Sequence, residues 1–138
     1  MAQQNVDIAR RTFPAFNRGD VDGFLECIDP DVEWIPIMAA LEGRVYRGHE
    51  GIRRWMEDLK TDWEVFEVHP EKFHDLGDQV LVLGRWRARA RGSGVELENR
   101  PGTWLLTVRD RKVVWMQTYT DRAEALEAAG VSEQDLGE

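Results

Sequence analysis

Three side chains of this sequence are candidates for acid–base chemistry: Glu33, His74 and Asp121. Glu33 lies beside Trp34 in a run that alternates like a β-strand. If it pointed inward, it would be a desolvated acid next to an aromatic ring, a setting in which carboxyl groups serve as proton donors. The alternation of Val32, Glu33 and Trp34 favours an exposed carboxylate instead. The catalytic residues therefore stay unassigned, with these three as candidates.

His74 and Asp121 also have simpler structural interpretations. His74 is the imidazole that could face the interior of the sheet, yet a histidine with satisfied hydrogen bonds accounts for it. Asp121 is expected near the mouth of a pocket, but it precedes a helix and is suited to cap the first turn of that helix. Neither residue is assigned a role by its type and position alone.

Other classes of catalytic site are not indicated by the spacing of the remaining groups. His69 and His74 are five residues apart, which places them on opposite faces of a strand. The sequence has no H-x-x-x-H motif or cysteine cluster, so we expect no metal and no cofactor. Ser93 and Ser132 fall in a turn and in the tail, which leaves no arrangement for a Ser–His–Asp triad.

Composition restricts the compartment and the partners. The 138 residues are 42% hydrophobic, which suits a single domain over residues 1–138 with a sizeable core. A net charge of -8 argues against nucleic-acid and anionic-membrane partners. The single cysteine, Cys27, excludes an internal disulfide, and the N-terminus lacks the apolar core of a signal peptide. We expect a cytoplasmic protein.

Hydrophobic periodicity predicts an α+β fold in which helices cover a long β-ribbon. Between residues 38 and 47 no period is visible, and this segment is expected to form a flap. The first helix contains Pro14, so we expect a kink there. The expected elements are helices over 3–17, 20–28, 48–63 and 121–129, strands over 31–37 and 63–73, and a three-stranded ribbon over 79–120.

The ribbon should have two different faces. If Arg91 pairs with Glu96 and Arg89 with Glu98, charged groups share one face and apolar groups the other. A two-residue turn at Asp110–Arg111 then continues both faces into the last strand. The first face carries Trp86, Ala88, Ala90, Val95, Leu97, Asn99, Thr103, Leu105, Thr107, Val114, Met116, Thr118 and Thr120. The second face carries Trp104, Leu106, Val108, Val113, Trp115, Gln117 and Tyr119.

Two apolar faces on one sheet need two covers. Helices can cover the first face, and a second copy of the chain would cover the other. We therefore expect a homodimer through Trp104, Leu106, Trp115, Gln117 and Tyr119. A bulge at Pro101–Gly102 is the open alternative, because one extra residue would exchange the faces beyond it.

Three stretches carry a resemblance to a known superfamily: NRGDVDGFLECIDPDVEW, YRGHEGIRRWMEDL and KVVWMQTYTDRAEALEAAGV. Together with the order of elements, they resemble the SnoaL-like proteins of the nuclear transport factor 2-like superfamily, which includes ketosteroid isomerase. The resemblance implies a cone-shaped, curved, mixed but mostly antiparallel sheet, wrapped around helices with an internal pocket. It also implies that the convex side forms a dimer.

The chemistry of ketosteroid isomerase does not carry over. Its general-base aspartate falls near Ile35 or Pro36, its tyrosine at Thr12, and its protonated acid near Thr103 or Trp104. None of these side chains can abstract a proton.

The pocket is expected to be apolar and aromatic, with a few small polar groups, as in sites for small molecules. Its expected lining is Phe16, Trp34, Met38, Trp55, Trp86, Leu97, Asn99, Thr103, Leu105, Met116 and Thr118. The function indicated is binding of an apolar cyclic metabolite, by an enzyme of the isomerase, cyclase or hydratase kind. The alternative is a non-catalytic ligand-binding or dimeric interaction module of the same fold.

Overall fold

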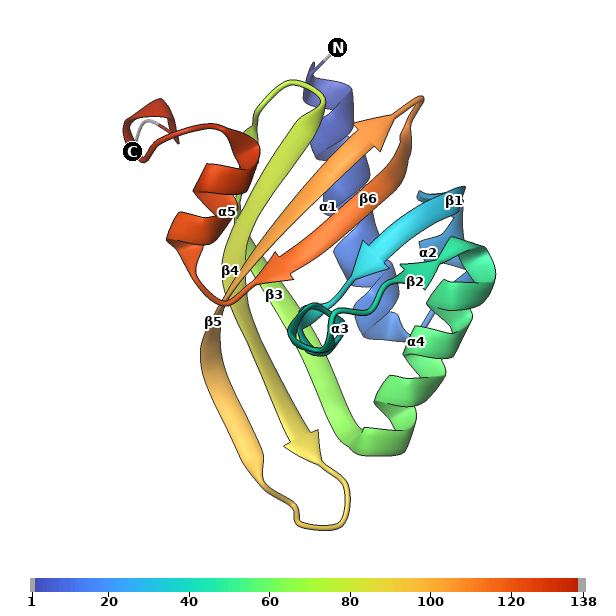
Figure 1. Ribbon diagram of the computed structural model, residues 1–138. Coiled ribbons are helices and arrows are strands. Elements are labelled where there is room, and N and C mark those ends of the chain that lie inside the picture. The colour runs from blue at the N-terminus through green and yellow to red at the C-terminus, as the bar shows by residue number, and fades with distance from the viewer. Residues whose placement is uncertain (1, 137–138) are drawn as a thin grey trace.

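The computed structural model describes residues 2–136, and it has the α+β architecture that the sequence predicts. A six-stranded, strongly curved sheet has the strand order β2-β1-β6-β5-β4-β3 (Figure 1). Among the strand pairs of the described residues, β1–β6 alone is parallel. The strands are β1 (Ile28–Ile35), β2 (Tyr46–Arg47), β3 (Trp63–Asp75), β4 (Gln79–Ala90), β5 (Glu96–Arg109) and β6 (Lys112–Tyr119). The helices are α1 (Ala2–Arg18), α2 (Val21–Glu26), α3 (Ile37–Glu42), α4 (Gly48–Asp62), α5 (Arg122–Ala129) and the short η1 (Gln134–Leu136).

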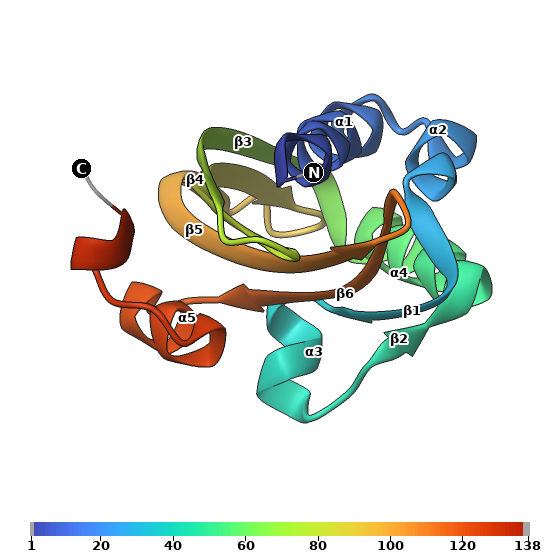
Figure 2. The same cartoon turned by 90° about the horizontal axis from the view of Figure 1, so that it is seen from above.

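Helices α1 and α4 lie on the concave side of the sheet, and α5 lies on the other side (Figure 2). The amphipathic spacing explains this placement, because α4 buries Ile52, Trp55 and Met56 on one stripe. The helix α1 continues through Pro14 to Arg18. No helix in residues 2–136 is long and apolar enough to cross a membrane.

The segment expected to be a flap is partly regular. Residues 37–42 form α3, which ends where Gly43 adopts a left-handed conformation, and Tyr46–Arg47 pair with β1 as β2. Ala39 is buried, whereas Met38 and Leu41 are 53% and 70% exposed. A six-residue helix shows too few turns for its period to be visible in the sequence.

The sequence left open whether a bulge exchanges the two faces of the ribbon. Such a bulge does occur, but at Asn99 rather than at Pro101–Gly102. Trp86 pairs with Arg100 and Ala88 with Leu97, so Glu98 and Asn99 stand opposite Arg87 alone. Asn99 adopts a φ of 56°, the left-handed conformation that asparagine tolerates better than most residues. The β4–β5 loop consists of residues 91–94, because the Ala90 backbone N–H donates to the Val95 carbonyl.

This bulge corrects several expectations for β5. Trp104, Leu106 and Val108 belong to the interior cluster of buried side chains. Thr103 and Leu105 therefore point to the opposite face, where Leu105 packs against α5. The Arg–Glu pairs stay on one face with a shifted register, since Arg89 pairs with Glu96 at 2.7 Å and Arg87 with Glu98 at 3.6 Å.

A second bulge reverses the effect of the first. The turn at Asp110–Arg111 has two residues as expected, with Arg109 opposite Lys112. Thr107 then pairs with Trp115 and Val108 with Val113, so Val114 is the extra residue. Val113 consequently joins the interior. Beyond Val114 the original assignment holds again, which is why Met116 faces inward and Trp115 outward.

The outer face of the ribbon is partly covered by the chain itself. Ala125 and Leu126 of α5 pack there with Leu81 and Leu105, and Trp115 and Tyr119 lie against the same cluster. Asp121 begins α5 as expected, accepting a hydrogen bond from the Ala123 N–H at 2.9 Å. The interface surface expected from the sequence is therefore wrong for Trp104 and Leu106, which are interior residues.

Candidate functional site

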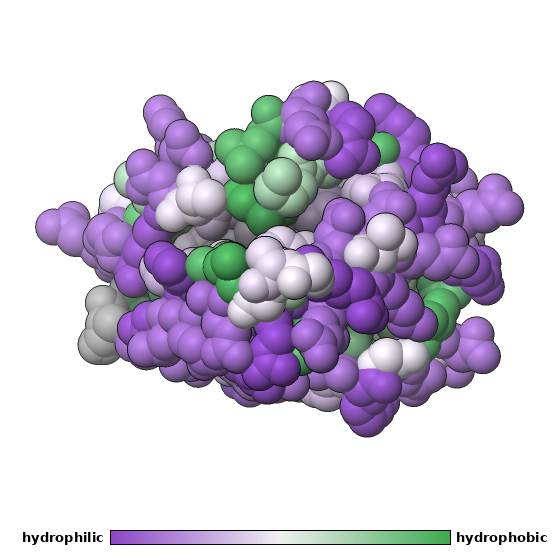
Figure 3. Space-filling model, turned by 90° about the horizontal axis from the view of Figure 1, so that it is seen from below, coloured by the Kyte–Doolittle hydropathy of each residue, from purple (hydrophilic) through white to green (hydrophobic). Residues whose placement is uncertain are grey.

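A cavity of about 580 Å³ lies between the concave face of the sheet and helices α1, α3 and α4. It opens near the end of α4, and hydrophobic side chains gather around a hollow on that face of the molecule (Figure 3). The volume falls in the range of sites for small organic molecules. The residues from α1 to α4 that line the cavity are Thr12, Phe13, Phe16, Phe24, Trp34, Pro36, Ile37, Met38, Ala39, Glu42, Arg44, Tyr46, Trp55, Asp58, Leu59 and Asp62. Those from β3 onward are Trp63, Phe66, Val68, Trp86, Leu97, Arg100, Pro101, Gly102, Trp104, Met116, Thr118, Tyr119 and Thr120.

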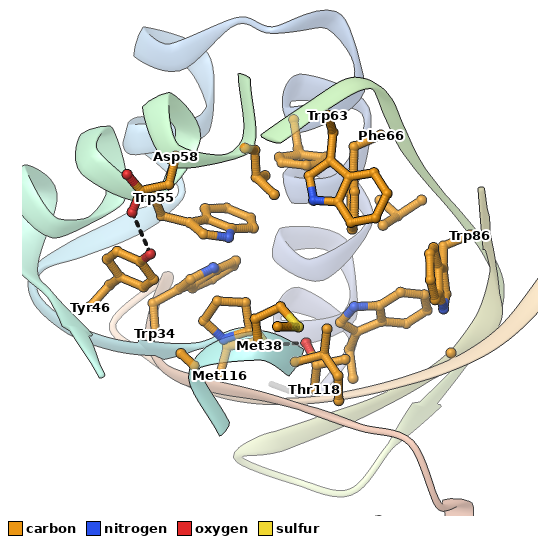
Figure 4. A pocket seen from close by; sticks show the side chains of 18 of the residues that line it. Trp34, Met38, Tyr46, Trp55, Asp58, Trp63, Phe66, Trp86, Met116 and Thr118 are labelled. Atoms are coloured by element: carbon orange, nitrogen blue, oxygen red, sulfur yellow. Dashed lines mark hydrogen bonds between the residues drawn. The ribbon is translucent and has the colours of Figure 1, made fainter. Parts of the chain in front are cut away.

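Aromatic rings form a continuous series around the cavity. Trp34 and Trp55 are in contact with ring centroids 5.3 Å apart, and Trp55 stacks on Phe16 at 5.1 Å. Phe16 meets Phe66 edge-on at 6.2 Å, and Phe66 stacks on Trp86 at 5.7 Å. Figure 4 shows Trp34 and Trp55 on one side of the space and Phe66 and Trp86 on the other. Such walls favour a flat guest that can stack against rings.

Gly102 makes room for a further ring. A Cβ atom at this position would lie 2.6 Å from Cη2 of Trp104 and 3.1 Å from Cδ1 of Trp86. Because glycine has no Cβ, the indole of Trp104 lies directly over the β5 backbone and meets the ring of Phe13 at 5.5 Å. Trp104 is therefore part of the cavity wall rather than of the outer surface.

One group of polar side chains lies at the end of the cavity where β2 meets α4. The Tyr46 hydroxyl donates a hydrogen bond of 2.6 Å to Oδ2 of Asp58 (Figure 4). Burial of the phenol raises the pKa of Tyr46, and the bond to Asp58 acts in the same direction, whereas Arg44 opposes it. The guanidinium carbon of Arg44 lies 5.4 Å from the Tyr46 ring centroid, and Arg44 also pairs with Glu42.

Two further polar side chains in the wall differ in their hydrogen bonding, because one is satisfied within the chain and the other has no partner within residues 2–136. The hydroxyl of Thr12, a residue only 1% exposed, donates to the Ile8 carbonyl at 2.8 Å and so satisfies its own helix. The indole N–H of Trp34 has no hydrogen-bond partner among the described residues, although Trp34 is only 5% exposed. Its ring packs against Phe24 and Trp55.

The three candidates for acid–base chemistry lie elsewhere. Glu33 pairs with Arg47 at 2.6 Å on the outside of β1. His74 sits near the far end of β3, opposite Leu81, and Asp121 caps α5. Burial, aided by Arg122 and Lys72, lowers the pKa of His74. The structure therefore brings none of the three into the cavity.

Most of the expected lining residues do reach the cavity. Asn99, Thr103 and Leu105 do not, because the bulge at Asn99 turns the following residues of β5 over. The expected residues that line it are Phe16, Trp34, Met38, Trp55, Trp86, Leu97, Met116 and Thr118.

Sequence analysis missed Tyr46, Asp58 and Arg44. A signal for Asp58 was present, because it follows Trp55 by three residues and so lies beside the buried stripe of α4, although Asp58 itself is exposed. Tyr46 and Arg44 lie in a segment without periodicity, and nothing in their spacing indicated an inward direction. Within residues 2–136, no group of three or more His, Cys, Asp or Glu side chains is arranged to hold a metal ion.

The chain belongs to the SnoaL-like domain family, whose model matches residues 9–116. A curated relative, the uncharacterized protein Rv0034 of Mycobacterium tuberculosis, is 30% identical over 122 residues, covering 86% of this chain and 91% of Rv0034. This relationship confirms the resemblance on which the fold was predicted.

Solved structures show the same fold. An NTF2-like protein of Burkholderia pseudomallei has a TM-score of 0.76 at 23% identity, covering 90% of this chain and 95% of that one. A protein of Jannaschia sp. CCS1 described as a SnoaL-like polyketide cyclase has a TM-score of 0.73 at 24% identity, with 94% of both chains covered. TerC, co-crystallized with polyporic acid, has a TM-score of 0.76 at 24% identity, covering 92% of this chain and 98% of TerC.

Proposed function

We propose that this protein binds a flat, largely apolar cyclic molecule in the cavity. The observation that carries the proposal is the series of ring contacts from Trp34 to Trp86 around a space of about 580 Å³. Stacking on such rings contributes binding free energy beyond the burial of area alone. The fold shared with TerC, which was crystallized with polyporic acid, supports a cyclic guest.

A second candidate function is catalysis on the bound molecule, of the isomerase, cyclase or hydratase kind. The Tyr46–Asp58 pair favours it, because an ionisable pair at the wall of an apolar cavity is a common arrangement for proton transfer. The shared fold with the Jannaschia protein described as a polyketide cyclase supports the same class. The non-catalytic alternative requires only the aromatic walls.

Calorimetric titration with 2-methoxynaphthalene tests binding, because this probe is flat and apolar and carries no hydrogen-bond donor. We expect saturable binding at one site per chain, and about tenfold weaker affinity in Trp86→Ala, which corresponds to the loss of ~1.4 kcal/mol of stacking and contact. The control is Leu83→Ala, a truncation on the same strand whose side chain packs on the opposite face. Absence of binding, or an equal loss in both variants, would contradict the proposal.

A further inference from the structure

Helix α3 is weakly fixed to the rest of the cavity wall. The ladder between β1 and β6 ends at Ile35, and Pro36 has no backbone N–H with which to continue it. The hydrogen bonds at the ends of α3 close within the segment itself, from the Ala40 N–H to the Pro36 carbonyl and from the Arg44 N–H to the Ala39 carbonyl. Figure 2 shows α3 projecting from the sheet beside β1.

The packing of α3 is also sparse. Ala39 is its buried residue, whereas Met38 lines the cavity although it is 53% exposed (Figure 4). Met38 therefore lies in the mouth of the cavity. Segments with few buried apolar contacts open locally at a low cost in free energy. Gly43 ends the helix in the left-handed conformation, with a φ of 72°, and has the conformational freedom of a hinge.

A series of contacts across the mouth joins the end of α3 to α4. Glu42, the last residue of α3, accepts a hydrogen bond from Nε of Arg44 at 2.6 Å. The guanidinium carbon of Arg44 lies 5.4 Å from the ring centroid of Tyr46, whose hydroxyl donates to Asp58 of α4. A hydrogen bond between the guanidinium and the Tyr46 side chain, followed by the bond to Glu42, raises the pKa of Arg44. We call Glu42, Arg44, Tyr46 and Asp58 the latch, and all four line the cavity.

The latch contains contacts that water can replace. The side chains of Arg44 and Glu42 are 49% and 50% exposed, so salt screens their ion pair and the pair contributes little to stability. A cation–π contact at an exposed site is similarly weak. Contacts of this strength can hold a short helix in one position and still release it during ligand exchange.

We propose that α3 is a gate at the mouth of the cavity, which turns about Pro36 and Gly43 and is held in place by the latch. When the latch opens, α3 moves away from α4 with Met38, and the guest enters or leaves through the widened mouth. The role in ligand exchange rests on the proposed binding function, whereas the motion of α3 requires no guest. Arg44 is the central member of the latch, because it contacts both Glu42 and Tyr46.

Arg44→Gln tests the gate, because it removes both contacts of the guanidinium and keeps a polar side chain. With 2-methoxynaphthalene as the guest, line-shape analysis of its methoxy proton resonance gives the dissociation rate, and calorimetric titration gives Kd. We expect the dissociation rate to rise about fivefold, the size expected from loss of one exposed ion pair and one cation–π contact. Kd should stay within about twofold, so that the association rate rises by a similar factor. A residue that merely contacts the guest would raise Kd together with the dissociation rate.

Arg47→Gln is the matched control, because Arg47 forms an ion pair with Glu33 at 2.6 Å on the outside of β1. This variant should have the rates of the wild type. Salt gives a second measurement of the latch. Raising NaCl from about 0.02 M to about 0.5 M should bring the wild-type dissociation rate toward that of Arg44→Gln, whose own rate should change little because it lacks the screened ion pair.

Amide hydrogen exchange follows the motion of α3 without any guest. The hydrogen-bonded amides of Ala40 and Gly43 should exchange at least about tenfold faster than that of Met56 in α4, and Arg44→Gln should accelerate them by about fivefold more while Met56 is unaffected. Amides of α3 as protected as Met56, or a dissociation rate that changes only in proportion to Kd in Arg44→Gln, would overturn the inference. If 2-methoxynaphthalene does not bind, the proposed function fails, and hydrogen exchange still decides whether α3 moves.

Discussion

Asn17 replaces a missing neighbour strand at one point of the sheet. Its Nδ2 donates to the Val68 carbonyl at 2.7 Å, and its Oδ1 accepts from the Val68 N–H at 3.0 Å. Val68 is buried on β3, which lies at the edge of the sheet. The side-chain amide of α1 therefore satisfies both backbone groups of this residue, as a paired strand would. It also fixes α1 over the cavity that Phe16, the preceding residue, lines.

Asn17→Ala should lower the free energy of unfolding by about 1–3 kcal/mol, because it leaves two buried backbone groups without partners. Urea denaturation monitored by circular dichroism would measure the loss. Gln4→Ala, an exposed change on the same helix, serves as the control and should have an effect within about 0.5 kcal/mol. Equal stability of the two variants would show that water replaces the amide at no cost.

At the scale of single residues, the sequence predicted the aromatic wall better than the polar end. Trp34, Trp55 and Trp86 were found because they recur with the period of a strand or helix, and burial of large rings follows from that period. Tyr46 could not be found in this way, since its inward direction depends on how a two-residue strand pairs with β1. Asp58 was not singled out, although it follows Trp55 by three residues and lines the exposed end of the cavity.

At the scale of elements, the order of the long strands followed from composition, whereas the bounds of β1 (Ile28–Ile35 instead of 31–37) and the register of β5 did not. The turn at Asp110–Arg111 was expected from its residue types. The bulges at Asn99 and Val114 could not be expected from residue types, because each bulge depends on how two strands curve around the same core. An asparagine in the left-handed conformation leaves no periodic pattern, and its effect is visible only in the side chains that it redirects.

Asn99→Val should destabilise the protein by about 1–2 kcal/mol, because a β-branched residue is strained at a φ of 56°. Asn99→Gly should be close to neutral, since glycine adopts this conformation without strain. Thermal unfolding of both variants measures the difference, and Glu98→Val provides a β-branched control at the adjacent position. If Asn99→Val proved as stable as the wild type, the bulge would not depend on this conformation.

At the scale of the whole molecule, the fold class could be predicted because the long helices and strands each had a signal and their order matched a known superfamily. Which element covers the outer face of the sheet could not be predicted. Among the described residues, Leu81, Leu105, Ala125 and Leu126 form its buried hydrophobic centre. The sequence showed α5 as a terminal helix, with no indication of which surface it would meet.

We retain the expected homodimer as a proposal, now limited to the part of the outer face near Trp115 and Gln117. Trp115→Glu should convert dimers to monomers, because a charge would be buried at the interface. Light scattering after size-exclusion chromatography measures the mass, and circular dichroism verifies folding. Val95→Glu, a similar change at an exposed hairpin residue, should leave the dimer intact. A wild-type monomer, or a dimeric Trp115→Glu variant, would refute this arrangement.

The bare backbone at Gly102 has a consequence for the range of compounds that the protein admits. One added carbon there would push the indole of Trp104 toward the guest, since the far end of that ring is the nearest obstacle. The longest molecule that fits would become shorter, while Tyr46, Asp58 and Arg44 would be left as they are. If the protein binds a cyclic guest as proposed, the length of that guest is limited at Gly102, a position separate from the Tyr46–Asp58 end of the cavity.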